Sequence, residues 1–221
     1  LEATLGCHGL LIEDSAQNIW IVGQQSSGHY PNNQHQLFFF KYHENGKLDI
    51  SYGENGKLMT QGPHAIYMPK VLKLFSDDRL LIAGLVAPKP GFGGSFLFEV
   101  DLTKPIDSNL ENHSVIVHDF EEEQHEELEG ILFLENGSLL LHGLSEFDRS
   151  RQSFFGLLNP DYSVNTKFGN NGYLFHQVEG LRLSDVHAGC LISDQKAFFT
   201  GTVMRSGMGW DLFVLGLELP E

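Results

Sequence analysis

Histidine residues placed beside an aspartate or a cysteine have the types and spacing for acid–base chemistry. His187 lies two residues after Asp185, and His8 directly follows Cys7. Such pairs, within hydrogen-bond reach, transfer protons or activate a nucleophile. The chain contains no GxSxG nucleophile motif, phosphate-binding loop, dinucleotide fingerprint or CxxC motif. We therefore predict no catalytic residue, and a hydrolase or lyase that uses these histidines is the alternative.

The segment Val117–Gly130 concentrates groups that bind metal ions. Its seven carboxylates are hard oxygen ligands of the kind that Ca²⁺ prefers, and His118 and His125 add nitrogen ligands for Zn²⁺. Their spacing matches no EF-hand, HExxH motif or calcium-binding nonapeptide repeat. Runs of like charge are usually solvated, so we predict a solvated loop with no metal and no cofactor. Ca²⁺ or Zn²⁺ binding is the alternative.

Four glycine-containing segments carry the candidate ligand-binding residues. The longest is Gly23–Gln36, which combines aromatic rings with amides, a combination that suits sugar binding. The others are Leu85–Gly94, Leu144–Gln152 and Thr202–Gly209, and loops of this kind often carry function. The predicted ligand-binding residues are His29, Tyr30, His35, Phe92, Arg149 and Trp210. The alternatives are a solvated polar loop and, for the aromatic residues, packing between structural units.

These segments recur because the chain repeats itself. Leu37–Leu58 aligns without a gap with Ser153–Leu174, at an offset of 116 residues, and a weaker copy lies halfway between them. In this middle copy Glu111 and Ser114 replace two glycines, which makes its turn less certain. A fourth copy, cut short by the end of the sequence, places Leu212 in the position of Phe154. Such a period must be recognised before local structure is predicted.

A second marker supports four repeats. Four short apolar segments each end in a glycine. These glycines are Gly23, Gly84, Gly143 and Gly201, and they are spaced by 61, 59 and 58 residues. We predict that each ends the second strand of its repeat, where a bend or a positive φ angle is needed.

Each repeat contains four short predicted strands. In the third repeat they cover Gly130–Glu135, Ser138–His142, Ser153–Asn159 and Tyr173–His176, with a hairpin turn at Glu135–Gly137. Leu37–Tyr42, the third strand of the first repeat, is apolar on both faces, so its sheet must be covered on both faces. No amphipathic helix is available to do so, which leaves other sheets. We predict an all-β fold, a β-propeller with four blades of four antiparallel strands.

The predicted blades divide a single domain over residues 1–221. They cover approximately 6–60, 61–117, 118–176 and 177–221, with residues 1–5 supplying the last strand of the fourth blade. Closing the ring in this way removes an exposed edge strand and gives a monomer. The alternative is part of a larger propeller, formed by a dimer or by a longer chain.

The phrase at Phe38–Gly56 reads F-x7-G-x-L-D-x-S-Y-G-x-N-G, and it resembles the bacterial delta-sixty repeat of β-propeller proteins. The resemblance covers all four repeats, most closely the first and third. It implies the propeller fold and a bacterial protein that is often exported. It brings no catalytic motif to this sequence.

Composition makes some classes of binding partner unfavourable. The formal net charge of −15 repels the phosphates of nucleic acids and anionic membranes. The longest apolar stretch, Leu80–Pro88, is far shorter than the ~20 residues of a membrane-spanning helix. The two cysteines, Cys7 and Cys190, are expected to be small buried thiols, or one disulfide if the protein is exported.

These observations predict a non-catalytic binding module of a secreted or periplasmic bacterial protein. Its partner is a protein or a carbohydrate. A protein is preferred, because the acidic segment would steer a basic partner electrostatically. An enzyme is the first alternative, and a structural segment of a longer repeat protein is the second.

Overall fold

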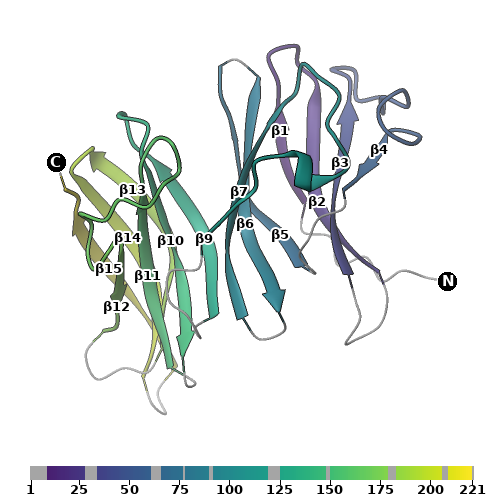
Figure 1. Ribbon diagram of the computed structural model, residues 1–221. Helices are drawn as coiled ribbons and strands as arrows, with labels where there is room; N and C mark the ends of the chain where they lie inside the picture. Colours follow the sequence, from purple (N-terminus) through teal and green to yellow (C-terminus); the bar gives the residue numbers. More distant parts are fainter. Residues whose placement is uncertain are drawn as a thin grey trace. The chain divides into compact units, whose positions relative to one another are not determined.

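The chain forms four antiparallel sheets of three or four strands (Figure 1). The computed structural model describes residues 9–27, 34–60, 66–76, 78–89, 92–118, 125–147, 150–178, 183–205 and 209–220. In this part of the chain there is no α-helix, and a single 3-10 turn, η1 (Leu110–Asn112), is present. The all-β class predicted from the sequence is confirmed. No helix among these residues is long and apolar enough to cross a membrane.

Each sheet is built from consecutive strands. Sheet one contains β1 (Gly9–Glu13), β2 (Ile19–Ser27), β3 (Gln34–Tyr42) and β4 (Lys57–Met59). Sheet two contains β5 (Ile66–Leu74), β6 (Arg79–Lys89), β7 (Phe92–Asp101) and β8 (Ile116–His118). Sheet three contains β9 (His125–Phe133), β10 (Leu139–Phe147), β11 (Ser150–Leu158) and β12 (Tyr173–His176). Sheet four contains β13 (Leu183–Ser193), β14 (Lys196–Arg205) and β15 (Gly209–Glu218), and one parallel bridge, between Arg151 and Leu183, joins it to sheet three.

The chain divides into two compact units, Leu1–His118 and Asp119–Glu221. The first unit holds sheets one and two, and its core includes Trp20, Phe39 and Phe96. The second unit holds sheets three and four, and its core includes Phe155 and Phe199. In β3, Leu37, Phe38 and Phe39 are all buried, so both faces of this strand are covered as its apolar pattern predicts.

The two most similar repeats share a turn with the same backbone conformation. Gly53 and Gly169 have φ angles of +57° and +52°, and a Cβ atom there would lie 2.3 and 2.2 Å from the carbonyl oxygens of Lys57 and Tyr173. Asn55 and Asn171 both have a φ angle of +54°. The predicted equivalence of these turns is confirmed, and the need for glycine has a steric cause.

The second repeat lacks these glycines, and its turn differs. Residues 110–112, which include Glu111, form the 3-10 turn η1 instead. The backbone N–H groups of Asn112 and His113 donate to the carbonyls of Asn109 and Leu110. A 3-10 turn needs no positive φ angle, so it tolerates residues other than glycine.

The marker glycines do not end their strands, which corrects the sequence prediction. Gly84, Gly143 and Gly201 lie within β6, β10 and β14, and none of them has a positive φ angle. Each lies beside an irregularity in the pairing with the preceding strand, and a Cβ atom would come within 1.9 to 2.1 Å of a backbone oxygen of that strand. Glycine is required because the preceding strand bulges against it.

The hairpins beyond these glycines are longer than predicted. The segments predicted as loops of eight or more residues belong largely to paired β-strands. For example, β10 and β11 are joined by nine residue pairs, the last of which is Phe147 with Ser150. In β2 the added residues, Gln24–Ser27, are all polar, and apolar patterning does not reveal them.

The fourth repeat is shifted by one residue from the predicted alignment. Phe38, Phe96 and Phe154 pair with Gly23, Gly84 and Gly143, whereas Gly201 pairs with Phe213. Phe213, and not Leu212, therefore takes the place of Phe154. The cause is a connection of three residues between β14 and β15, where β10 and β11 are joined by two.

In each unit, an equivalent hydrogen bond links the two sheets. Asp78 accepts the backbone N–H of Ser15 at 3.0 Å, which joins the turns of sheets one and two. Asp194 accepts the backbone N–H of Glu135 at 2.9 Å, which joins the turns of sheets three and four. The two aspartates are 116 residues apart, which is the predicted offset of the repeat.

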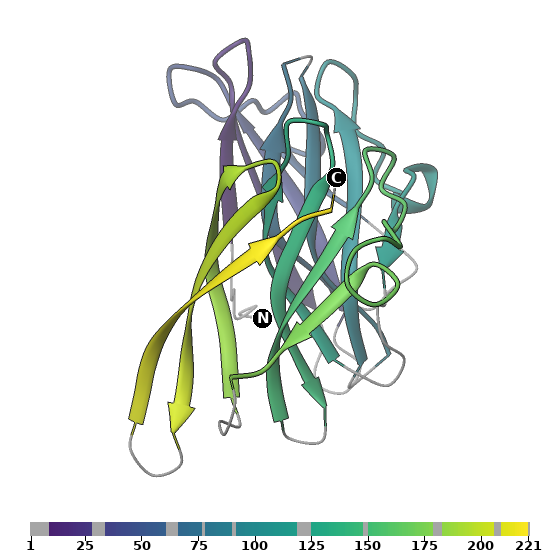
Figure 2. The ribbon, with the colours of Figure 1, turned by 90° about the vertical axis from the view of Figure 1, so that its left-hand side faces the viewer.

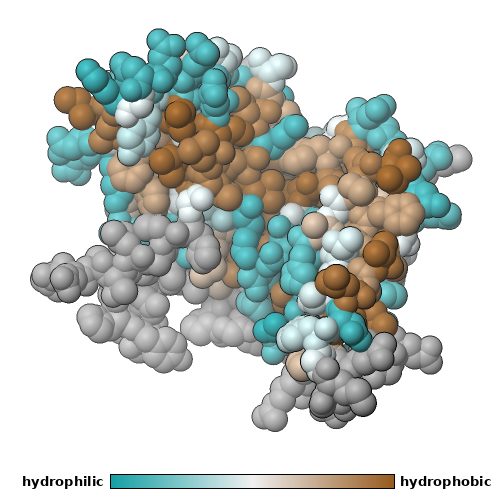
Figure 3. Space-filling model, turned by 180° about the vertical axis from the view of Figure 1, so that it is seen from behind, coloured by the Kyte–Doolittle hydropathy of each residue, from teal (hydrophilic) through white to brown (hydrophobic). Residues whose placement is uncertain are grey.

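β15 is the outer strand of sheet four (Figure 2), and it has one covered and one exposed face. Phe213, Leu215 and Leu217 pack into the core of the second unit. On the other face Leu212 and Val214 are 84% and 70% exposed, and Figure 3 shows apolar side chains at the surface. The segment Leu1–Leu5, predicted to pair with this strand, lies outside the described residues.

Candidate functional site

The residues predicted to bind a ligand are distributed over different sheets. His29, Tyr30 and Arg149 lie outside the described residues. His35 and Phe92 belong to β3 and β7, and Trp210 belongs to β15, where it is 55% exposed. These three are strand residues, which corrects their assignment to loops.

The acidic segment Val117–Gly130 is not one loop. Its ends belong to β8 and β9, and residues 119–124 lie outside the described residues. Glu126 is fully buried in β9, so this part of the segment is not a solvated run of charge. Among the described residues no group of three or more His, Cys, Asp or Glu side chains is arranged to hold a metal ion.

The structure assembles a different group of charges in the second unit, around Asp185. This aspartate lies in β13 and is only 6% exposed. It is brought next to sheet three because β13 starts beside β11, through the bridge between Arg151 and Leu183. The hydroxyl of Ser153 donates to the carbonyl of Ser184 at 3.2 Å and strengthens this junction.

Arg151 connects two carboxylates at this junction. Its Nη1 atom lies 3.8 Å from Oδ2 of Asp185, and its Nε donates to Oε2 of Glu146 at 3.2 Å. Arg151 and Glu146 are directly opposite each other in the pairing of β11 with β10, so the register of the hairpin places them together. The other carboxylate oxygen of Asp185, Oδ1, is buried and accepts no hydrogen bond from any described residue.

The electrostatic environment of Asp185 disfavours its charge. Burial raises the pKa of its carboxyl group, and the negative charges of Glu127 and Glu146 raise the pKa further. Arg151 and His187 act in the opposite direction, and the net shift of the pKa is upward. We call Glu127, Glu146, Arg151, Asp185 and His187 the Asp185 site. Three carboxylates and one guanidinium give it negative charge.

His187 interacts electrostatically with Asp185, as its spacing predicts, but its ring forms a hydrogen bond elsewhere. Its Nε2 atom lies 2.8 Å from Oγ1 of Thr202, which is opposite Asp185 in the pairing of β13 with β14. The other predicted pair, Cys7 and His8, lies outside the described residues. Cys190 is exposed in β13, so the expected burial of this thiol is wrong.

A second histidine lies deeper in the same unit. His142 in β10 is buried at 4% exposure, and its ring packs edge-on against Phe199 with the ring centroids 5.1 Å apart. Gly130 makes room for it, since a Cβ atom there would lie 2.5 Å from Nε2 of His142. Burial lowers the pKa of His142 to about 4, so the imidazole is neutral at pH 7.

Sequence analysis found two members of the site, Asp185 and His187, and missed the rest. Arg151 was passed over for Arg149, two residues earlier. The pairing of Arg151 with Glu146 depends on the register of the hairpin. The sequence predicted a loop over Leu144–Gln152, so this register could not be predicted. The signal that could have found it is opposite charge at cross-strand positions once the hairpin is extended.

No protein-family model and no curated protein matches the chain. The chain is similar to the crystal structure of a protein of unknown function from Dyadobacter fermentans DSM 18053, with 9% sequence identity and a TM-score of 0.41. The similarity covers 96% of this chain and 76% of that chain. At this level the similarity supports no conclusion about fold or function.

Proposed function

We propose that this chain is a non-catalytic binding module whose Asp185 site receives a basic side chain of a partner protein. The observation that carries the proposal is the buried Oδ1 atom of Asp185, which accepts no hydrogen bond from any described residue. A buried polar atom without a partner costs about 1–3 kcal/mol, and a lysine or arginine donor would remove that cost.

The charge around Asp185 favours a cation over an anion. Glu127 and Glu146 add negative potential, and the single guanidinium of Arg151 is already shared between Glu146 and Asp185. The formal net charge of −15 adds long-range attraction for a basic partner, which speeds association at low ionic strength.

The experiment is fluorescence anisotropy with labelled peptides rich in lysine, arginine or glutamate, and with a neutral peptide. We expect the basic peptides to bind and the affinity to fall as salt is raised. Asp185→Asn removes the buried charge and should weaken binding at least tenfold. Glu218→Gln, an equal charge change on the exposed end of β15, should leave it within twofold. Equal binding of all four peptides, or equal loss in both variants, would contradict the proposal.

Acid–base catalysis at the same site is a second candidate, which the raised pKa of Asp185 favours. A panel of hydrolase and lyase substrates tests it. Turnover that is lost in Asp185→Asn and in His187→Ala would support an enzyme, and turnover that survives both changes would exclude this site.

The four sheets are proposed to be the blades of a β-propeller of the bacterial delta-sixty type, in a secreted or periplasmic protein. Each sheet is a meander of consecutive strands, which supports the proposal. In a closed ring the segment Leu1–Leu5 would pair with β15 and complete sheet four. Deleting this segment should then lower the free energy of unfolding by about 2 kcal/mol or more. An unchanged free energy would favour the larger propeller. Fractionation of the source bacterium tests the location.

A further inference from the structure

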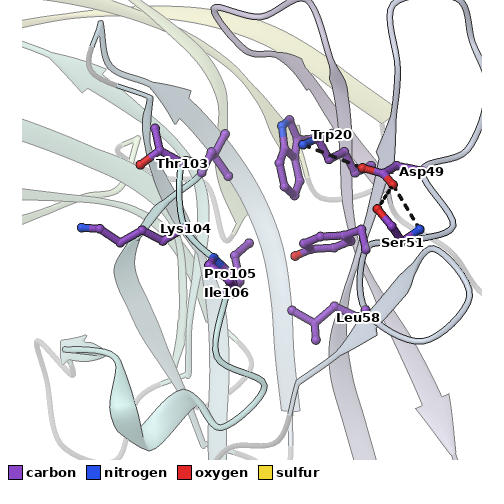
Figure 4. A pocket seen from close by; sticks show the side chains of 12 residues that line it. Trp20, Asp49, Ser51, Leu58, Thr103, Lys104, Pro105 and Ile106 are labelled. Atoms are coloured by element: carbon purple, nitrogen blue, oxygen red, sulfur yellow. Dashed lines mark hydrogen bonds and ion pairs between the residues drawn. The ribbon is translucent and has the colours of Figure 1, made fainter.

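The first unit contains a cavity of about 410 Å³ between sheets one and two, separate from the Asp185 site. Figure 4 shows Trp20, Asp49, Ser51 and Leu58 on one side of it and residues 103–106 on the other. The lining residues belong to strands of sheet one, to the connection between β3 and β4, or to the connection between β7 and β8. A volume of this size is within the range of small-molecule sites.

Part of the lining of the cavity is apolar. It includes Leu58, Leu102, Pro105 and Ile106, of which Leu102 and Ile106 are each 8% exposed. The ring of Tyr52 forms a further wall and packs edge-on against Trp20, with centroids 5.1 Å apart. These groups offer contact to carbon–hydrogen surfaces of a ligand.

The rim supplies hydrogen-bonding groups of both kinds and little net charge. The ammonium of Lys41 lies 3.9 Å from Oδ2 of Asp49, so the two charges offset each other. Lys104 extends away from the cavity in Figure 4 and pairs with Asp101 at 2.6 Å. Ser51 donates to Oδ1 of Asp49 and leaves Oδ2 available to accept from a ligand.

Tyr52 provides the group that most needs a partner. Its hydroxyl is buried and forms no hydrogen bond with any described residue. Burial raises the pKa of this phenol, so it remains a neutral donor. A ligand oxygen beside it would accept the hydrogen bond that the protein does not supply.

We propose that this cavity binds a neutral saccharide of one or two rings. A pyranose presents carbon–hydrogen groups on one face and hydroxyl groups around its edge, which matches an apolar interior beneath a rim of paired donors and acceptors. An anion would meet the carboxylate of Asp49, and a cation would meet Lys41, so neither charged class fits as well. Sugar binding, which the sequence suggested for Gly23–Gln36, is thus proposed for this cavity instead.

The test is saturation-transfer difference NMR with neutral methyl glycosides of mono- and disaccharides, and with uronates and amino sugars as charged competitors. We expect neutral glycosides to bind the wild-type chain. Tyr52→Phe should weaken binding about three- to tenfold, the loss expected for one hydrogen bond. Tyr42→Phe is the matched control, because Tyr42 lies on the same strand as Lys41 but does not line the cavity. Melting curves establish that each variant is folded.

Asp49→Asn separates the ligand classes. It should weaken a neutral saccharide about tenfold, because a charged acceptor becomes a neutral one. It should strengthen an anion, because repulsion is removed. Tighter binding of uronates that Asp49→Asn improves would overturn the proposal, as would the absence of binding by every glycoside, or binding that no cavity variant changes. Asp185→Asn should have no effect on glycosides, so this proposal and the proposed function succeed or fail separately.

Discussion

At the scale of single residues, Asp185 and His142 are buried in the second unit, and their surroundings stabilise the neutral form of each. Desolvation is the main cause in both cases, and it acts on an acid and on a base. Asp185 has charged neighbours and belongs to the proposed binding site. His142 has an aromatic neighbour, and no described residue bonds its Nδ1 atom. We therefore propose a binding role for Asp185 and a structural role for His142.

His142 predicts a loss of stability in acid. Its pKa is about 4 in the folded chain, against 6.5 for an ordinary histidine, so the unfolded chain binds more protons between these pH values. The free energy of unfolding should therefore fall as the pH is lowered from about 6.5 to 4, by roughly 3 kcal/mol, and this contribution should not change further below pH 4.

Urea denaturation across this pH range measures the effect, and His142→Leu should flatten the curve. The same change at the half-buried His176 serves as the control. A curve that keeps its full slope in His142→Leu would assign the acid sensitivity to other groups.

At the scale of elements, glycine is required at two kinds of position for different reasons. In the turns at Gly53 and Gly169 both a positive φ angle and a nearby carbonyl exclude a side chain. Within β6, β10 and β14 the φ angles are not positive, and a side chain is excluded by the backbone of the bulged preceding strand. At Gly143 and Gly201 the rings of Phe154 and Phe213 add a second close contact. Alanine substitutions at control glycines separate the cost of a positive φ angle from the cost of a close contact.

For the turns, Gly53→Ala and Gly169→Ala should each lower the free energy of unfolding by about 3 kcal/mol. Gly46→Ala is the control for backbone strain alone, because Gly46 has a φ angle of +75° and no atom within 4 Å of the added Cβ. It should cost about 1 kcal/mol. Equal losses at the three positions in chemical denaturation would show that the close carbonyl is unimportant.

For the bulges, Gly143→Ala should cost about 2 kcal/mol or more, since its Cβ would lie 2.0 Å from the carbonyl oxygen of Glu127. Gly216→Ala, also within a strand, meets nothing closer than 3.4 Å and should be nearly neutral. Thermal melting of the two variants compares them directly. A neutral Gly143→Ala would mean that the bulge relaxes at no cost.

Elements were predicted well where a local signal decides them. β12 has the bounds predicted, Tyr173–His176, and the turn at Glu135–Gly137 joins β9 to β10 with Gly137 at a φ angle of +85°. The lengths of the hairpins and the role of the marker glycines were not predictable, because both depend on contact with a neighbouring strand. The Asp185 site was only partly predictable. Its two β13 residues are close in sequence, whereas the other members are brought near them by strand pairing, which the sequence pattern does not show.

At the scale of the whole molecule, the proposed propeller makes a claim about Leu212 and Val214. Both are largely exposed on β15 among the described residues, and ring closure would cover them. Leu212→Lys and Val214→Lys should then each lower the free energy of unfolding by about 2 kcal/mol or more.

Ile50→Lys is the control, because Ile50 is 74% exposed in a turn of sheet one, and it should cost less than about 0.5 kcal/mol. Guanidinium denaturation gives all three values. If the β15 variants behave like Ile50→Lys, that face of sheet four stays open, and a four-bladed ring is excluded.

The meander order of the strands has a consequence for how the chain folds. In the part of the chain that the structure describes, every antiparallel pairing between strands joins neighbours along the chain, and the one parallel pairing is the bridge between Arg151 and Leu183. Each sheet can therefore form by closing short hairpins, at a low entropic cost, before it meets another sheet. A low average sequence separation between contacts speeds folding relative to β-sandwiches with distant pairings. We therefore expect each sheet to form early in folding, and the two sheets of a unit to join later through the core that they share.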